Sequence, residues 1–371
     1  MDAAQNKRDL PLCESIQIAT AASRCDPGAR AVQCKRHAQV KIKEPYLLFL
    51  GDSPDTLAAK VAYGIRHWRP DKCVGQLRLE GCRADTGLPD LTLAQATEAE
   101  VATLVVGVAN RGGVIADSWV AVLLEALDSG MDIAAGLHDR LADVPALAER
   151  ATQLGQRILD VRHPRQTFPI GDGKPRSGHR LLTVGTDCSV GKMYTSLAFE
   201  EEMKGRGIPT DFRATGQTGI LIAGEGVAID AVVADFIAGA TEWLTPAADT
   251  DHWDVVEGQG SLFHPSYAGV SLGLLHGAQP DVLVMCHEST RTHLRGLPGY
   301  KLPNIVECID ANLSAARLTN PAARIAGVAV NTSALDDLEA TRILEDIESQ
   351  TGLPTVDPVR QGVARLVDEL V

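Results

Sequence analysis

The residues with the clearest chemical potential form the stretch "GTDCSVGKM", which follows an apolar strand pattern and opens a helical one. Glycines let successive backbone N–H groups converge, and the amino end of a following helix adds positive potential, so this pattern is typical of phosphate binding. The alternative is a plain strand–turn–helix junction. The predicted cofactor-binding residues are Gly185, Thr186, Asp187, Cys188, Ser189, Val190, Gly191, Lys192 and Met193.

This loop departs in two ways from the usual phosphate-binding loop (P-loop), which has four residues between its glycines and a Ser or Thr after the lysine. Five residues separate Gly185 from Gly191, and Met193 stands where a hydroxyl would help to hold Mg²⁺. Because methionine offers no such hydroxyl, we predict that the loop grips a phosphate without a metal. If Mg²⁺ and ATP were used, Thr195 or Ser196 would have to supply the metal-binding hydroxyl.

A carboxylate follows another expected strand. Glu257 comes directly after "DVV", at the carboxyl end of the strand, where ligands of parallel sheets bind. Gly258 and Gly260 allow a tight turn on either side of Gln259. We predict a catalytic role for Glu257, against the alternative of a capping or solvated acid.

Two polar segments, 214–226 and 286–304, also follow expected strands. Arginine suits bidentate recognition of a carboxylate, and histidine can act as a base near neutral pH. Either segment could equally be an ordinary surface loop. The predicted substrate-binding residues are Arg213, Thr218, Arg291 and Arg295, and the candidate catalytic bases beside Glu257 are His287 and His264.

The chain contains eight cysteines and no C-x-x-C pair, so we expect reduced thiols and neither a disulfide framework nor a zinc site. Cys188 could carry an acyl group, because a helix amino end lowers a thiol pKa. We expect it instead to be a spectator in the loop.

The elements that must position these residues alternate between strand and helix patterns, which predicts an α/β fold with parallel sheets. We predict a Rossmann-like domain over 44–165 and a P-loop NTPase-like domain over 166–371, with the Pro-, Gly- and Arg-rich stretch 162–180 at the boundary. A helix is expected over 226–244. Residues 1–43 lack the apolar centre of a secretory signal and are expected to be a disordered extension.

Composition narrows the choice of partners. The net charge of −13 and the lack of a long basic run argue against nucleic acid as a main partner. No run of about 18 apolar residues is present, so no membrane span is expected. We expect a cytoplasmic protein that acts on small molecules.

The motifs resemble known families. "GTDCSVGKM" resembles the loop of dethiobiotin synthetase, including its five-residue gap, and "VVEGQGS" and "IAGVAVN" are similar to later segments of that enzyme. From Glu44 onward the chain resembles a narrower family, long catalogued only as a domain of unknown function, that pairs a Rossmann-like domain with a P-loop domain. Within it, the sequence resembles the D-glutamate N-acetyltransferases. The segments that carry this match are "GTDCSVGKM", "RATGQTGILIAGEGVAIDAVVADFIAGA" and "VEGQGSLFHPSYAGVSLGLLHGAQPD".

The resemblance implies an N-acetyltransferase that moves an acetyl group from acetyl-CoA to D-glutamate in D-amino acid catabolism, in a homo-oligomer. The P-loop would then hold a phosphate of acetyl-CoA, one of the candidate bases would take the ammonium proton, and the arginines would bind the substrate carboxylates. Two alternatives remain: an ATP- and Mg²⁺-dependent ligase of the dethiobiotin synthetase type, and a nucleotide-binding protein without turnover.

Overall fold

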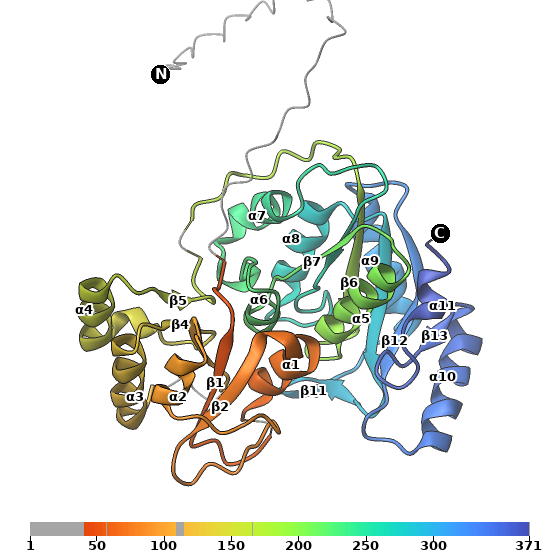
Figure 1. Cartoon of the computed structure of the whole chain (residues 1–371). Helices are drawn as coiled ribbons and strands as arrows, with labels where there is room; N and C mark the ends of the chain where they lie inside the picture. Colours follow the sequence, from red (N-terminus) through yellow and green to blue (C-terminus); the bar gives the residue numbers. More distant parts are fainter. Residues whose placement is uncertain (1–40, 57, 109–114, 165, 371) are drawn as a thin grey trace, which may run out of the picture. The chain divides into compact units, whose positions relative to one another are not determined.

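Two parallel β-sheets with helices between their strands make up the protein in a computed structural model, which describes residues 41–56, 58–108, 115–164 and 166–370 (Figure 1). This confirms the predicted α/β class. The described residues belong to one compact unit, Gln39–Val371. The extension expected over 1–43 lies almost entirely outside the described residues, and the domain bounds stay a prediction.

The first sheet has the strand order β2-β1-β3-β4-β5, and all its strands run parallel. This is a doubly wound order, whose direction reverses at β1. All six residues of β1 are buried, as expected for an inner strand covered on both faces. The strands are β1 (Tyr46–Gly51), β2 (Cys73–Arg78), β3 (Thr103–Val106), β4 (Asp132–Ala135) and β5 (Ile158–Asp160), and the α-helices are α1 (Lys60–Trp68), α2 (Leu93–Glu98), α3 (Asp117–Asp128) and α4 (Pro145–Leu154).

The second sheet has the order β13-β12-β9-β6-β8-β7, again parallel throughout, with a small antiparallel hairpin, β10–β11, after β9. The strands are β6 (His179–Gly185), β7 (Thr210–Arg213), β8 (Trp253–Val256), β9 (Val282–Glu288), β10 (His293–Leu294), β11 (Leu297–Lys301), β12 (Arg324–Asn331) and β13 (Thr355–Val356). The α-helices are α5 (Lys192–Gly205), α6 (Gln217–Ala223), α7 (Ile237–Leu244), α8 (Ala268–Ala278), α9 (Ile305–Arg317), α10 (Asp337–Thr351) and α11 (Ala364–Val367).

The prediction of a helix over 226–244 is wrong for most of that range. Only α7, at the end of that range, is α-helical, and two single 3₁₀ turns precede it. Val232 and Val233 between those turns have extended backbone, in keeping with the weak helix preference of β-branched residues. Conversely, α6 lies within the segment 214–226, for which the sequence predicted either a ligand-binding segment or a surface loop and no helix.

Helix α6 joins the two sheets. Its residues Ile220, Leu221 and Ile222 belong to an apolar cluster that also contains residues of β1, β3, β4 and α1 from the first sheet's side. The approach is close, because a Cβ on Gly136, just after β4, would lie 2.9 Å from the Cβ of Gln217. The two sheets therefore share one core around α6.

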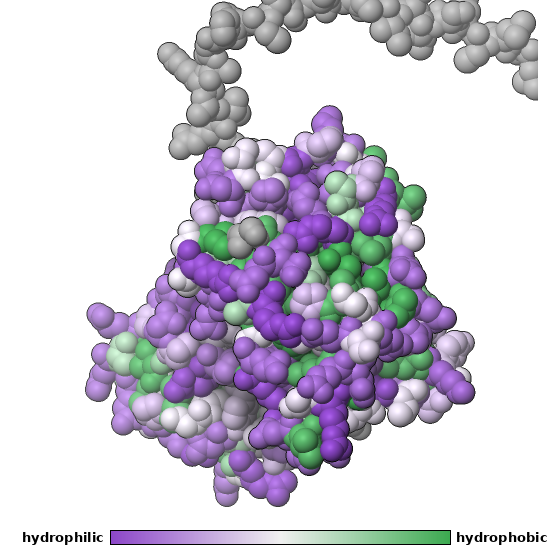
Figure 2. Space-filling view, turned by 90° about the vertical axis from the view of Figure 1, so that its right-hand side faces the viewer, coloured by the Kyte–Doolittle hydropathy of each residue, from purple (hydrophilic) through white to green (hydrophobic). Residues whose placement is uncertain are grey.

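The surface of the described residues carries both hydrophilic and apolar side chains. Figure 2 shows a face on which hydrophilic side chains predominate and apolar patches lie among them. None of the helices that the structure describes has both the length and the apolar character needed to cross a bilayer. The expected homo-oligomer stays a prediction.

Candidate active site

The predicted phosphate-binding loop links β6 to α5, as the strand–turn–helix pattern requires. Ser189 and Gly191 take positive φ angles, +53° and +99°, so the chain curls before the helix begins at Lys192. The buried Lys192 ammonium donates to the carbonyl oxygen of Asp187 at 2.8 Å. Burial lowers the pKa of Lys192 from its ordinary value, so its charge is held in a site of low polarity.

The loop is held from outside by the segment that follows β9. The fully buried Asp187 carboxylate accepts hydrogen bonds from the Arg291 guanidinium, at 2.8 Å, and from the backbone N–H of Arg295, at 2.7 Å. Arg291 also donates to the Cys188 carbonyl oxygen at 2.6 Å, and the Arg295 side chain donates to the Ser189 hydroxyl. The structure thus binds Arg291 to the loop itself, which suits a positioning role better than a substrate clamp.

Glu257 lies at the carboxyl end of β8 and is buried. Its Oε2 accepts the backbone N–H groups of Thr215 and Gly216, at 2.9 and 3.1 Å, just before α6. Burial raises the pKa of Glu257 to about 7, although the two N–H groups, the Gln259 amide and the Lys192 charge each favour the ionised form. The carboxyl group can therefore take up and release a proton near neutral pH.

Three glycines leave room for this arrangement. A Cβ on Gly219 of α6 would lie 2.3 Å from Glu257 Oε2, and one on Gly216 would lie 2.6 Å from the Gln259 amide nitrogen. A Cβ on Gly258 would lie 1.7 Å from the Thr183 carbonyl oxygen of β6. The glycines that the sequence places around Glu257 are thus required by close packing between β6, β8 and α6.

The two histidine candidates differ. The Nδ1 atom of His287, in β9, lies 3.0 Å from the Thr186 hydroxyl of the loop, and burial lowers the His287 pKa. His287 is therefore neutral at physiological pH and can act as a base. His264 accepts the Ser266 N–H at Nδ1, and its Nε2 lies 3.2 Å from the Arg295 carbonyl oxygen. With both ring nitrogens engaged, His264 is the least suited of the three bases.

The residues after the loop lysine do not fit the magnesium ion of ATP-hydrolysing P-loop proteins. Met193 packs against the apolar cluster around α6. Thr195 donates to the Gly191 carbonyl oxygen at 3.1 Å and also contacts the Cys286 thiol. Ser196 is buried against Thr183 and backbone carbonyl oxygens, so neither hydroxyl is aimed at a phosphate site.

Cys188 lies in the loop, and burial raises its pKa despite the neighbouring cations. The thiol is thus mostly protonated near neutrality, which favours the spectator reading. Its sulfur lies within 4.8 Å of possible ligand atoms of Asp187 and His264. Because Asp187 is already paired with Arg291, and both His264 nitrogens are engaged, this group does not suit a metal ion. The five cysteines that the structure describes are all free.

Arg213 and Thr218 are placed differently from the other predicted residues. Arg213 donates to the buried Asp254 at 2.6 Å and to Asp211 at 3.1 Å, so its charge is neutralised inside the protein. The Thr218 methyl group lies where α6 meets α1, 3.7 Å from a Cβ placed on Gly64. These contacts give both residues structural roles.

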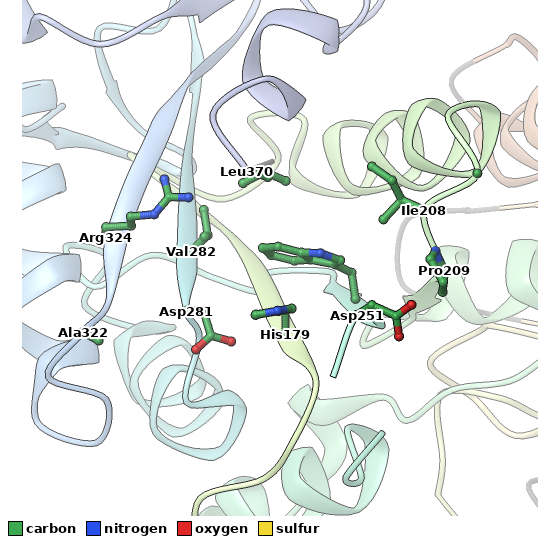
Figure 3. A pocket seen from close by; sticks show the side chains of 11 residues that line it. His179, Ile208, Pro209, Asp251, Asp281, Val282, Ala322, Arg324 and Leu370 are labelled. Atoms are coloured by element: carbon green, nitrogen blue, oxygen red, sulfur yellow. The ribbon is translucent and has the colours of Figure 1, made fainter. Parts of the chain in front are cut away.

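A cavity of about 600 Å³ lies at the opposite edge of the second sheet (Figure 3). Its lining includes the first residues of four strands: His179, Trp253, Val282 and Arg324. The P-loop, Glu257 and His287 lie instead at carboxyl ends, where parallel sheets bind ligands. The cavity is therefore separate from the candidate active site.

The fold and the site together define a two-sheet α/β protein with a P-loop that lacks the magnesium hydroxyl. Two family models match the chain. A domain of unknown function described as a P-loop domain matches residues 169–367, and its Rossmann-like companion matches 77–164. The chain belongs to this family, DUF1611.

Three similar proteins each match most of the chain. It is 57% identical over 329 residues to a D-glutamate N-acetyltransferase of Tritonibacter scottomollicae, covering 89% of this chain and 99% of that protein. It is 50% identical over 331 residues to a D-glutamate N-acetyltransferase of a Pseudoalteromonas species, covering 89% and 100%. A crystal structure of a DUF1611 family protein from Anabaena variabilis is 32% identical, with a TM-score of 0.77 over 88% of this chain and 99% of that one.

The sequence did not reveal the contacts that hold the predicted site together. The N–H groups of Thr215 and Gly216 bind Glu257, and no side-chain pattern reveals such a contact. The pairing of Asp187 with Arg291 joins residues 104 positions apart. Both residues were named as candidates, but their mutual contact was not foreseen.

Replacing Arg213 with Ala should destabilise the fold by about 3 kcal/mol, because the buried Asp254 carboxylate loses its guanidinium partner and, among the described residues, keeps only the contact with the His252 ring, at 3.3 Å. Chemical denaturation monitored by circular dichroism measures this. A second variant, Arg213→Met with Asp254→Leu, should recover most of the loss, since it removes both charges. Unchanged stability in Arg213→Ala would contradict the structural role.

Replacing Gly219 with Ala should lower the melting temperature, because the new Cβ would clash with the Glu257 carboxylate. Alanine otherwise favours helices over glycine by about 1 kcal/mol. Gly269→Ala in α8 is the matched control, since no heavy atom lies within 4 Å of its added Cβ. If both variants gained stability alike, the close packing against Glu257 would be refuted.

Proposed function

We propose that this protein is a D-glutamate N-acetyltransferase that uses acetyl-CoA as the acyl donor. Its identity of 57% and 50% to two proteins with that name, over almost their whole lengths, carries the substrate assignment. The site supplies matching chemistry: a P-loop for a phosphate of the donor, and a buried carboxyl group with a pKa of about 7 for the proton transfer.

In the proposed reaction the ammonium group of D-glutamate first loses a proton to Glu257. The free amine then attacks the thioester carbonyl carbon, a C–N bond forms and the C–S bond breaks. Coenzyme A leaves as a thiolate, which takes the second proton that the nitrogen loses as the amide forms, and Glu257 releases the first proton to solvent. A base whose pKa lies near the working pH suits the first step, because it is partly ionised and still holds the proton that it accepts.

Glu257 is our choice of base over His287 because of what surrounds it. Its Oε2 is fixed by two backbone N–H groups, and the buried Lys192 charge interacts with the carboxylate. Lys192 and the loop amides hold the donor. The two arginines of the 286–304 segment contribute differently, since Arg291 braces the loop and the exposed Arg295 lies at its rim.

The ATP- and Mg²⁺-dependent ligase reading finds less support in the residues present. Thr195 or Ser196 would have to supply the hydroxyl for the metal, and both hydroxyls are engaged within the protein. Acetyl transfer needs neither ATP nor Mg²⁺. Thiol release from acetyl-CoA should therefore proceed without them, and a strict requirement for both would favour the ligase.

The direct test is a thiol-release assay with acetyl-CoA and D-glutamate, with L-glutamate as the comparison. Lys192→Ala should raise KM for acetyl-CoA about tenfold or more, because a charged hydrogen-bond donor to phosphate is lost. The variant Lys174→Gln is the control, as Lys174 is an exposed residue that pairs with Asp172. Absence of thiol release by the wild type with either acceptor would overturn the proposed function.

Glu257→Gln should lower kcat about a hundredfold or more, the usual contribution of a general base. In the wild type, kcat should rise with pH through about 7, since the base works only when deprotonated and burial has raised its pKa to about 7. The glutamine variant should lose this acidic limb. If the limb persists in Glu257→Gln and disappears in His287→Asn, the base is His287.

A further inference from the structure

The two oxygens of the Glu257 carboxyl group have different surroundings. Oε2 accepts the backbone N–H groups of Thr215 and Gly216, at 2.9 and 3.1 Å. Oε1 lies beside the side chain of Gln259, because a Cβ on Gly216 would lie 3.2 Å from Oε1 and 2.6 Å from the Gln259 amide nitrogen. Since the backbone occupies Oε2, Oε1 is the oxygen that can exchange a proton with a ligand.

The orientation of the Gln259 amide is fixed by its nitrogen. The Thr215 hydroxyl donates its hydrogen to the Glu257 carbonyl oxygen at 2.5 Å, so it can only accept from the amide. Gln259 Nε2 is that donor, at 3.1 Å, and a hydrogen bond from the same amide lowers the Glu257 pKa. The backbone is held as well, since the Ser271 hydroxyl donates to the Gln259 carbonyl oxygen of the main chain at 2.7 Å.

The oxygen at the other end of this amide, Gln259 Oε1, is free to bind a ligand. The side chain is half-buried, and nothing in the described part of the chain donates to Oε1. The oxygen is not sealed inside the protein either, because the enclosed polar atoms that lack a partner among the described residues all belong to other side chains. An acceptor oxygen therefore lies open beside the base Glu257.

We propose that Gln259 Oε1 binds the amino group of the acceptor and holds it against Glu257 Oε1. The inference rests on the proposed function, in which the acceptor is an amino acid. An ammonium group has three N–H donors, and a carboxylate oxygen beside an amide oxygen accepts two of them. A purely structural role would use Nε2 of Gln259 and leave its open oxygen without a purpose.

The three hydrogens of the ammonium group then have separate fates. One passes to Glu257 Oε1, and a second passes to the coenzyme A thiolate as the C–N bond forms and the C–S bond breaks. The third stays on the nitrogen and becomes the N–H of the amide product. Gln259 binds this third hydrogen throughout, so the nitrogen lone pair that the first transfer exposes is held in one direction for attack.

The test compares D-glutamate with glutarate, which has the same two carboxylates and no amino group. Calorimetric titration gives the affinity of each variant for both compounds. Gln259→Met keeps the length of the side chain and removes both amide atoms. It should weaken D-glutamate binding about tenfold or more, the effect of losing a hydrogen bond to a charged group, and leave glutarate binding and KM for acetyl-CoA unchanged.

Two further variants complete the comparison. Gln259→Glu keeps an acceptor oxygen and loses the Nε2 donor, so it should still bind D-glutamate more tightly than glutarate. If only the contact of Nε2 with Thr215 mattered, Gln259→Glu would be as poor as Gln259→Met. Gln156→Met is the matched control, since Gln156 is a half-buried glutamine between α4 and β5, and it should behave like the wild type.

Two results would overturn the role of Gln259. One is an unchanged affinity of Gln259→Met for D-glutamate, and the other is an equal loss of affinity for D-glutamate and glutarate, which would point to the carboxylates or to the shape of the site. Should Gln259→Met not fold, equal affinities of Gln259→Glu for the two compounds would contradict the role. Failure of the wild type to bind D-glutamate removes the proposed function as well, whereas the two results above remove the role of Gln259 only.

Discussion

The buried carboxylate of Glu257, fixed by the Thr215 and Gly216 N–H groups, is the contact on which the rest of the site depends. It ties the end of β8 to the start of α6, and it interacts with the charge of Lys192 in the P-loop. Because the carboxyl group lies out of water, its proton is held more tightly than in solution. Small residues at 216, 219 and 258 follow from the same crowding.

Helix α6 connects the Glu257 contact to the rest of the molecule. Residues just before it bind Glu257, while its apolar side packs into the core shared with β1 and α1. Met193 belongs to the same contact, so the residue that replaces the usual metal hydroxyl helps to join the two halves. A P-loop that need not hold Mg²⁺ can use that position for packing. The phosphate-binding loop and the first sheet are thereby fixed against one another.

The sequence predicted the α/β class, the P-loop and the acid at the end of β8, because each depends on local patterns of strand, glycine and charge. It could not predict which polar groups pair across the fold. Arg213 looks like a ligand for carboxylates in the sequence, yet it neutralises the buried Asp254. Arg291 looks the same, yet it holds Asp187 of the loop.

The measurement that tests the central claim most directly is the titration of Glu257 itself. Infrared or carbon-13 NMR spectra of glutamate-labelled protein, with Glu257→Gln as the difference reference, isolate this one carboxyl group. The account predicts that it is half protonated near pH 7. Half protonation near the ordinary glutamate value of 4.5 would contradict it, because the carboxylate would then be neither strongly desolvated nor poised to exchange a proton at neutral pH.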